Sequence, residues 1–238
     1  MKIHLISYGD KKYDLRVEEF KTEAMATRFF DEIRVFRYED IDLEFRNEFK
    51  EIFQSTRAGG FIWKPYFMKK TLKEMKYGDV LVYCDAGCCI NGAGRGRFNH
   101  YLNFLSQSEK GIIAFQLPHK EYRYTKKEVF NQFDVAEDVI ESGQLVATII
   151  LLKKCDHSMN MVDLWYNTVK ENPDLFTDNM DNAIQHPEFV AHRHDQSIWS
   201  VLLKTHGAEI IPDETYFDDF EKQGAAFPLW AARIRPID

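Results

Sequence analysis

The chain has 238 residues, of which 45% are hydrophobic and 29% are charged, and its net charge is −7. This composition is ordinary for a folded protein, and the acidic balance without a long basic run argues against binding nucleic acid through its phosphates. No apolar run is long enough to cross a bilayer and no signal-peptide pattern opens the chain, so we expect a cytoplasmic protein without a transmembrane segment.

Hydrophobic periodicity predicts strands and helices that alternate along the first part of the chain. The predicted elements there are a strand at 3–8, a helix at 17–30, a short strand at 33–36, a helix at 41–53, a helix at 65–75 and a strand at 80–84. Pro65 suits the first turn of its helix, where a missing N–H has no partner to lose. The apolar run at 80–84 is typical of a strand that is buried on both faces.

The second half continues in the same way. It is predicted to hold helices at 98–105, 126–133, 135–140, 161–170 and 196–204, strands at 112–117, 145–152 and 210–211, and an ordered tail at 227–238. The alternation predicts an α/β fold, a single Rossmann-like domain over 1–238 with a mostly parallel central sheet flanked by helices. In such sheets ligands bind at the carboxyl ends of the strands.

The first candidate site is the segment after the strand at 80–84. Asp85 follows that strand directly, and Ala86 and Gly87 come next. A carboxylate at this point can hold a divalent cation that bridges two phosphates, because hard cations prefer oxygen ligands. Gly87 would let the backbone approach a ligand closely. The alternative is that Asp85 only caps the following turn.

The second candidate is the segment 57–65, which contains Arg57, Gly59-Gly60, Trp63 and Lys64. It brings cations and an aromatic ring to the start of a helix, and helix N-termini attract anions. Lys64 is therefore a candidate for binding a diphosphate. The alternative is a surface lysine beside a packed tryptophan.

The third candidate is the run from His192 to Gln196, at the start of a predicted helix. It holds two imidazoles, a guanidinium, a carboxylate and an amide, and His and Asp are common acid–base and metal-binding groups. We interpret it as functional. The alternative is that Asp195 serves as the helix N-cap.

Two further groups carry weaker signals. The segment 91–97 is rich in Gly and Arg but has neither a P-loop nor a dinucleotide-binding pattern, so we interpret it as a mobile basic flap near Asp85. Cys84, Cys88, Cys89 and Cys155 do not have the paired spacing of a zinc site, and we expect them to be reduced thiols.

Together these segments resemble GT-A-type glycosyltransferases of bacteria and viruses. That family has a Trp-x-Trp-Lys-Pro segment, a strand ending in Asp-Ala-Gly and a late His-Arg-His-Asp-Gln-Ser-Ile. The counterparts here are Phe61 to Pro65, Tyr83 to Gly87 and His192 to Ile198, and the resemblance covers roughly residues 1–235.

The resemblance implies a nucleotide-sugar donor, a glycan or other hydroxyl acceptor, and a divalent metal ion, Mn²⁺ or Mg²⁺. Most GT-A enzymes hold the metal with an Asp-x-Asp pair, but Gly87 stands at the second acidic position, which leaves Asp85 as the only acid of that motif. A second metal ligand would come from elsewhere in the chain, or the metal would bind only together with the donor. The residues implied at the donor are Ser7, Tyr8, Arg57, Trp63, Lys64, Asp85, Ala86 and Gly87. The residues implied in catalysis are Asp195, Gln196 and His194.

In an inverting enzyme of this type, Asp195 would take the proton of the acceptor hydroxyl. In a retaining one it would orient the substrate, with Gln196 near the anomeric carbon. Two alternatives remain. One is a metal-dependent phosphohydrolase that uses Asp85, His192, His194 and Asp195 as ligands, and the other is a non-catalytic sugar-binding module.

Overall fold

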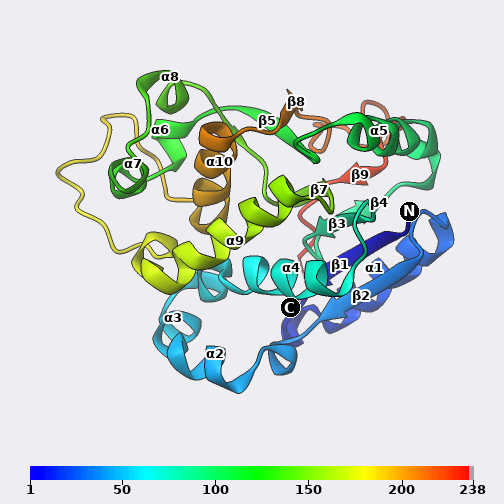
Figure 1. The fold of residues 1–238 in the computed structure, drawn as a ribbon, viewed down its shortest axis with the longest axis horizontal. Helices are drawn as coiled ribbons and strands as arrows, with labels where there is room; N and C mark the ends of the chain where they lie inside the picture. The colour runs from blue at the N-terminus through cyan, green and yellow to red at the C-terminus, as the bar shows by residue number, and fades with distance from the viewer. Residues whose placement is uncertain (236–238) are drawn as a thin grey trace.

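The computed structural model describes residues 1–235 (Figure 1). One seven-stranded sheet has the order β2-β1-β3-β7-β5-β6, with β8 paired to β5. Its strands are β1 (Ile3–Tyr8), β2 (Glu32–Phe36), β3 (Val80–Cys84), β5 (Ile112–Lys120), β6 (Gly143–Leu145), β7 (Ile149–Lys153) and β8 (Glu209–Pro212). A separate pair is formed by β4 (Cys89–Ile90) and β9 (Leu229–Trp230).

The helices come between these strands. They are α1 (Asp14–Thr27), α2 (Leu43–Glu48), α3 (Lys50–Ser55), α4 (Trp63–Glu74), α5 (Arg95–Gln107), α6 (Glu121–Tyr124), α7 (Lys127–Phe133), α8 (Glu137–Ile140), α9 (Asp156–Glu171) and α10 (His194–His206). Short 3₁₀ turns occupy Lys11–Tyr13, Tyr38–Asp40, Arg57–Phe61, Gly92–Gly94 and Pro173–Phe176.

The sheet is mostly parallel, as predicted. Strands β2, β1 and β3 run in one direction, and β5 and β8 share that direction because β7 lies antiparallel between β3 and β5. Only β6 and β7 run the other way. The α/β class predicted from the alternating elements is therefore confirmed.

Helices cover both faces of the sheet because side chains on each strand alternate in direction. On β3, Leu81 and Tyr83 join a core with α4, α9 and α10, which Figure 1 shows together in front of the sheet. Val80 and Val82 join a second core with α1 and α5 on the other face. A strand buried on both faces needs the continuous apolar run that the sequence has at 80–84.

Two predicted elements are divided in the structure. The predicted helix 41–53 becomes α2 and α3, separated at Phe49, whose ψ of 25° departs from helical geometry. The predicted strand 145–152 becomes β6 and β7, separated by residues 146–148. The second division matters for the site, because the Ala147 carbonyl accepts a hydrogen bond from Lys64 and its N–H donates to Gln196.

The segment 91–97, interpreted as a flap, is packed against other parts of the chain. Asn91 donates to the carbonyls of Ala225 and Phe227, and Arg97 pairs with Glu214. A Cβ on Gly94 would lie 2.3 Å from Pro228 N, so only glycine fits there. None of these residues lines the cleft beside Asp85 described below. The end of the predicted ordered tail, residues 236–238, lies outside the described residues.

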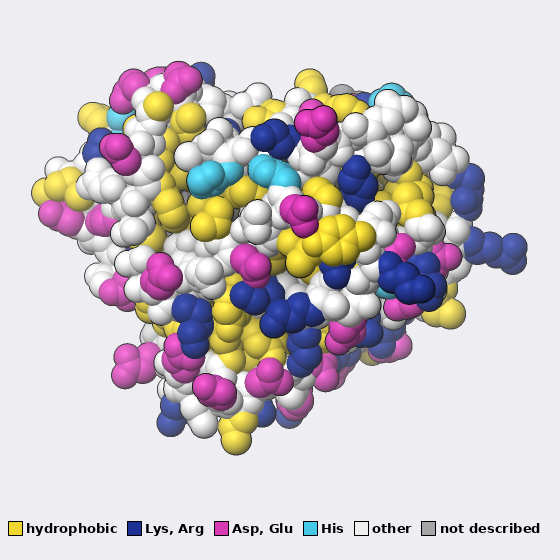
Figure 2. All heavy atoms as spheres, in the orientation of Figure 1, with side chains coloured by type: hydrophobic (Ala, Val, Ile, Leu, Met, Phe, Trp, Pro, Cys, Tyr) yellow, Lys and Arg dark blue, Asp and Glu magenta, His cyan; other side chains and the backbone are white. Residues whose placement is uncertain are grey.

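Within the described residues, no helix has both the length and the apolar character to cross a membrane. Figure 2 shows one face of the molecule, on which acidic and basic side chains are intermixed.

Candidate active site

A cleft of about 470 Å³ opens at the carboxyl ends of β1 and β3. Tyr8 ends β1 and Asp85 follows β3, so two strands contribute to its floor. The first residues of α4 and α10 supply Lys64 and Asp195. The lining also includes Arg57, Ala58, Phe61, Trp63, Ala86, Gly87, Ala147, Thr148, His192, Arg193, His194, Gln196, Arg233, Ile234 and Arg235.

The centre of the cleft is a lysine between two carboxylates. Lys64 Nζ lies 2.5 Å from Asp195 Oδ2 and 3.4 Å from Asp85 Oδ1. Lys64 also donates to the Ala147 carbonyl at 3.0 Å. These three contacts match the three N–H groups of an ammonium. The Lys64 ammonium therefore lies among three protein oxygens and balances the charge of both carboxylates.

Burial and charge act against each other in this group. The Lys64 side chain is 2% exposed and that of Asp195 is 6% exposed, whereas that of Asp85 is 32% exposed. Burial alone would lower the pKa of Lys64, but Asp195 and Asp85 outweigh it and raise that pKa. Burial raises the pKa of Asp195, and Lys64 offsets only part of this effect. Asp195 is thus a more basic carboxylate than one in water.

Aromatic rings form one wall of the cleft. The rings of Tyr8 and Trp63 stack with centroids 4.0 Å apart. Lys64 Nζ lies 4.9 Å from the ring centroid of Tyr83, whose hydroxyl donates to Asp85 Oδ1 at 2.5 Å. A flat aromatic surface beside a charged group suits a base or a sugar ring.

A left-handed turn presents part of this wall. Ala58, Gly59, Gly60 and Phe61 all have φ between 48° and 60°. Glycine adopts this conformation without strain, whereas Ala58 and Phe61 each cost about 1–2 kcal/mol. A Cβ on Gly60 would also lie 2.6 Å from the Phe176 carbonyl oxygen. The Gly59-Gly60 pair therefore makes the turn possible, and the turn brings Arg57 and Phe61 to the cleft.

The two histidines of the 192–196 run are held by backbone groups. His192 Nε2 lies 2.8 Å from the Leu175 carbonyl, and burial lowers the pKa of His192 to about 3. The ring is therefore neutral at pH 7, and its Nδ1 accepts from the Lys126 N–H. His194 Nδ1 contacts the Phe176 carbonyl at 3.0 Å. Both line the cleft, but these contacts do not leave the four free ligands that a phosphohydrolase metal site would need.

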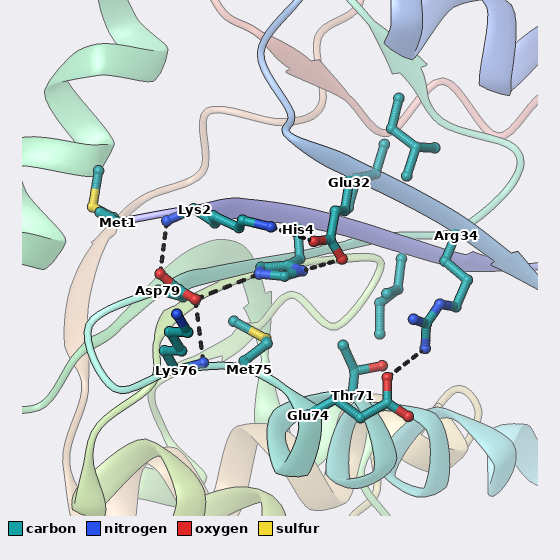
Figure 3. Close-up of a pocket in the computed structure, with 13 residues that line it drawn as sticks. Met1, Lys2, His4, Glu32, Arg34, Thr71, Glu74, Met75, Lys76 and Asp79 are labelled. Atoms are coloured by element: carbon teal, nitrogen blue, oxygen red, sulfur yellow. Dashed lines mark hydrogen bonds and ion pairs between the residues drawn. The ribbon is translucent and has the colours of Figure 1, made fainter.

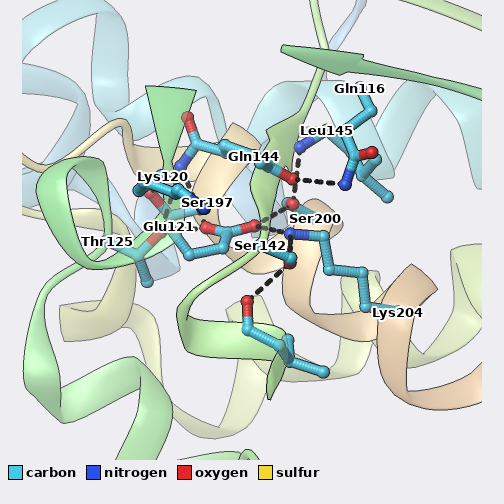
Figure 4. A network of polar contacts seen from close by, with 12 residues as sticks. Gln116, Lys120, Glu121, Thr125, Ser142, Gln144, Leu145, Ser197, Ser200 and Lys204 are labelled. Carbon is cyan, nitrogen blue, oxygen red and sulfur yellow. Dashed lines mark hydrogen bonds and ion pairs between the residues drawn. The ribbon is translucent and has the colours of Figure 1, made fainter. Parts of the chain in front are cut away.

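A buried polar network lies behind Gln196, and its other members were not among the predicted site residues. Figure 4 shows the part of it around Glu121 and Gln144. Gln196 Nε2 donates to Gln144 Oε1 at 2.7 Å, and Gln144 Nε2 donates in turn to Thr125 Oγ1 at 3.0 Å. Glu121, fully buried, pairs with Lys204 at 2.9 Å and accepts from Thr125. These side chains fix the amide of Gln196 against the cleft wall. Nothing in their local sequence distinguishes them from ordinary polar residues.

The C-terminal segment forms the other side of the cleft, and it too was missed. The Ile234 N–H donates to the Gly87 carbonyl at 2.9 Å. A Cβ on Gly87 would lie 2.8 Å from the Ile234 carbonyl oxygen. Glycine is therefore required at this position for the C-terminal segment to pass, whereas the sequence analysis had assigned its freedom to ligand approach.

The structure brings together nearly all of the predicted site residues. Ser7 is the exception, because it is buried beneath the cleft and does not line it. Asp195 is the second residue of α10, and Arg193 occupies the N-cap position, so the alternative role of Asp195 as N-cap is wrong.

The site residues do not fit a divalent metal ion. Within residues 1–235, no group of three or more His, Cys, Asp or Glu side chains is arranged to hold one. The two carboxylates that line the cleft floor share the ammonium of Lys64, and a second cation beside it would be repelled. At nucleotide sites such ions are held by one or two carboxylates together with substrate phosphates and waters, and here both carboxylates are already paired with Lys64.

A second hollow, of about 510 Å³, lies at the opposite ends of β1 and β3 (Figure 3). His4 is placed between Glu32 and Asp79, at 3.2 Å and 3.7 Å. Arg34 pairs with Glu74 at 2.8 Å. The charged groups that line this hollow are largely paired with one another.

No family model matches the chain, and no curated protein matches its sequence. Several solved structures are similar to it. A glycosyltransferase involved in the glycosylation of the major capsid of PBCV-1 is 8% identical, with a TM-score of 0.49, over 97% of this chain and 93% of that one. The galactosyltransferase LgtC, in complex with donor and acceptor sugar analogs, is 12% identical, with a TM-score of 0.46, over 98% and 88%.

Mouse xyloside xylosyltransferase 1 is 11% identical, with a TM-score of 0.46, over the full length of both chains. All three are glycosyltransferases. At these identities and TM-scores, the function of the chain has to be argued from its site residues.

Proposed function

We propose that the chain is a glycosyltransferase of the GT-A type, which moves a sugar from a nucleoside-diphosphate sugar to a hydroxyl group of an acceptor such as a glycan. The proposal takes residues 1–238 as one catalytic domain, since strands from Ile3 to Pro212 share one sheet. The observation that carries it is the buried Lys64 between Asp85 and Asp195, on the floor of a cleft at the carboxyl ends of β1 and β3.

In the transfer step the protein has three functions to perform. The bond between the anomeric carbon and the diphosphate oxygen breaks, and its electron pair leaves with the diphosphate. The acceptor oxygen forms the new bond to the anomeric carbon, and its proton must go to a base. The protein therefore has to bind the donor, stabilise the negative leaving group and accept a proton.

We assign the proton to Asp195. It is a buried carboxylate whose pKa is raised by burial, and it faces the cleft. Lys64 keeps it ionised in the resting enzyme through the 2.5 Å contact. A carboxylate in this state is a stronger base than one in water, which favours proton transfer near neutral pH.

We assign the donor to the side of the cleft near Asp85. The exposed part of Asp85 is available to a ribose or sugar hydroxyl, and the stacked rings of Tyr8 and Trp63 offer a surface for the base. Gln196 is held by Gln144 and Ala147, so we assign it a positioning role next to the sugar.

The test is a panel of UDP-, GDP-, CDP- and dTDP-sugars, each incubated with the purified chain and simple glycoside acceptors. Release of the nucleoside diphosphate and formation of a new glycoside are both measured. We expect one donor class to give both products. A chain that binds a nucleoside diphosphate without turnover would be the sugar-binding module instead, and a chain that binds none of the nucleotides would contradict the proposal.

A further inference from the structure

Four arginines line the cleft and share one property. Within residues 1–235, none of them makes an ion pair with a carboxylate: Arg57, Arg193, Arg233 and Arg235. Elsewhere Arg16 pairs with Glu23, Arg34 with Glu74, and Arg97 with Glu214. Arginines that line a concave surface without a carboxylate partner are the groups that an anionic ligand would meet.

Two of the cleft arginines, Arg193 and Arg233, lie near each other. Burial lowers the pKa of Arg193, and the nearby charge of Arg233 lowers it further. Arg193 lies over the ring of Tyr124 at 3.7 Å, which supports its guanidinium without neutralising it. Like charges gathered in this way repel one another until an anion binds among them.

The C-terminal segment is held where its arginines reach the cleft. The Ala231 N–H donates to the Thr215 carbonyl at 2.7 Å, and the Ile234 N–H donates to the Gly87 carbonyl at 2.9 Å. Arg233 and Arg235 flank Ile234, so the contact with Gly87 places both beside the loop that carries Asp85. Arg233 has a φ of 56°, a left-handed conformation that an arginine adopts only at some cost.

We propose that Arg233 and Arg235 bind the diphosphate of the donor directly, and that the enzyme works without a metal ion. This inference rests on the proposed function and adds to it the chemistry that stabilises the leaving group. The guanidinium forks take the role that a divalent cation has in metal-dependent enzymes, because they bind phosphate oxygens in pairs and neutralise their charge. The charge of Lys64 is already balanced by Asp85 and Asp195, so the arginines are the cations of the cleft that lack a carboxylate partner within residues 1–235.

The experiment is titration calorimetry with UDP, GDP, CDP and dTDP, and with the corresponding nucleosides, first in EDTA and then with MnCl₂. It compares wild type with Arg233→Gln/Arg235→Gln. The matched control, Arg34→Gln/Lys222→Gln, removes two cations outside the cleft. Arg233→Lys/Arg235→Lys keeps the charges but not the forks.

We expect one nucleoside diphosphate to bind in EDTA, with an affinity that MnCl₂ changes little. The Gln double variant should lose about tenfold or more in that affinity, since a hydrogen bond to a charged group contributes about 1.5–3 kcal/mol. Nucleoside binding and the control variant should be unaffected, and the Lys variant should recover part of the loss.

Two results would overturn the inference, and they differ in what they say of the function. Binding that appears only with MnCl₂, or that survives in the Gln double variant, would leave the glycosyltransferase proposal standing and remove the arginine role. A failure of all four nucleoside diphosphates to bind in either buffer would overturn both.

Discussion

The two ends of β1 and β3 differ in whether the charged side chains around them are paired within the protein. At the amino ends, His4 is placed between Glu32 and Asp79 and Arg34 pairs with Glu74, so the charges are balanced within the protein. At the carboxyl ends, Lys64 is balanced by two carboxylates, but the arginines that line the cleft have no carboxylate partner among the described residues. The first arrangement pairs its charges within the protein, whereas the second, in our proposal, leaves positive charge for a ligand.

The buried carboxylates at the two ends, Asp79 and Asp195, differ in the direction of their pKa shifts. Burial would raise the pKa of Asp79, but hydrogen bonds from the backbone N–H groups of Lys2 and Lys76 outweigh it and lower that pKa. Asp195 is as buried but has no such bonds, and its pKa is raised. A carboxylate that accepts hydrogen bonds from backbone N–H groups stays ionised, whereas a buried carboxylate beside a single ammonium can take up a proton more readily.

The largest effect is expected for Lys64→Met. It removes the cation from Asp195, and an uncompensated buried charge costs about 3–5 kcal/mol of unfolding free energy. Transfer should be lost. The pKa of Asp195 should rise further, so the stability defect should shrink as the pH falls and the carboxyl is protonated.

The measurement is denaturant unfolding between pH 5 and 8. The double variant Lys64→Met/Asp195→Asn should recover much of the stability without recovering activity, because it removes both charges. A defect in Lys64→Met that does not change with pH would mean that lost packing, rather than the unpaired carboxylate, is its cause.

Asp195→Asn alone is expected to lower turnover by about 10² to 10⁴, the usual range for a lost general base. Affinity for the nucleoside diphosphate should stay close to wild type, because the assigned donor contacts lie elsewhere in the cleft. Steady-state kinetics and calorimetry on the same preparation check both values. A loss of nucleotide affinity with normal turnover at saturation would place Asp195 at the donor instead.

Asp79→Asn is the matched change at the amino ends. It should lower the unfolding free energy by about 1–3 kcal/mol at pH 7, because the anion accepts two backbone hydrogen bonds. The lowered pKa of Asp79 makes this contribution present at neutral pH and lost as the pH falls below about 4. Thermal unfolding from pH 3 to 7 measures it, and turnover of the folded variant should equal that of wild type.

The smallest effect is expected for Gly87→Ala. The added methyl group would lie 2.8 Å from the Ile234 carbonyl oxygen, so the C-terminal segment must move. Nucleoside diphosphate affinity should fall severalfold while the melting temperature changes little, since the displaced segment is exposed. Unchanged affinity would show that the position of Arg233 and Arg235 does not matter to the nucleotide.

The sequence predicted the parts of this site that depend on local pattern. The apolar runs of β1 and β3 were recognisable, and the rule that ligands bind at carboxyl ends brought Tyr8 and Asp85 to one place. Lys64, Asp85 and Asp195 were each predicted as site residues, from three separate segments of the sequence. Their ion pairing was not predicted, because it depends on how α4 and α10 pack on the sheet.

Other parts had no local signal. The run 145–152 is apolar apart from Thr148 and was predicted as one strand, but it breaks at residues 146–148, where the Ala147 backbone contacts Lys64 and Gln196 from distant segments. Gln144 and Glu121 lie in ordinary polar surroundings in the sequence, and only the fold places them behind Gln196. Arg233 and Arg235 reach the cleft because Gly87 admits the C-terminal segment.

The most direct test of the contrast between the two ends is hydrogen–deuterium exchange with and without the nucleoside diphosphate that binds in the calorimetric panel. We expect slower exchange in peptides that cover 57–64, 85–88, 193–196 and 233–235. Peptides that cover 1–4, 32–34 and 76–79, around the amino-end hollow, should not change. Protection at the amino ends, with none at the carboxyl ends, would mean that the nucleotide does not bind in the cleft at the carboxyl ends of β1 and β3.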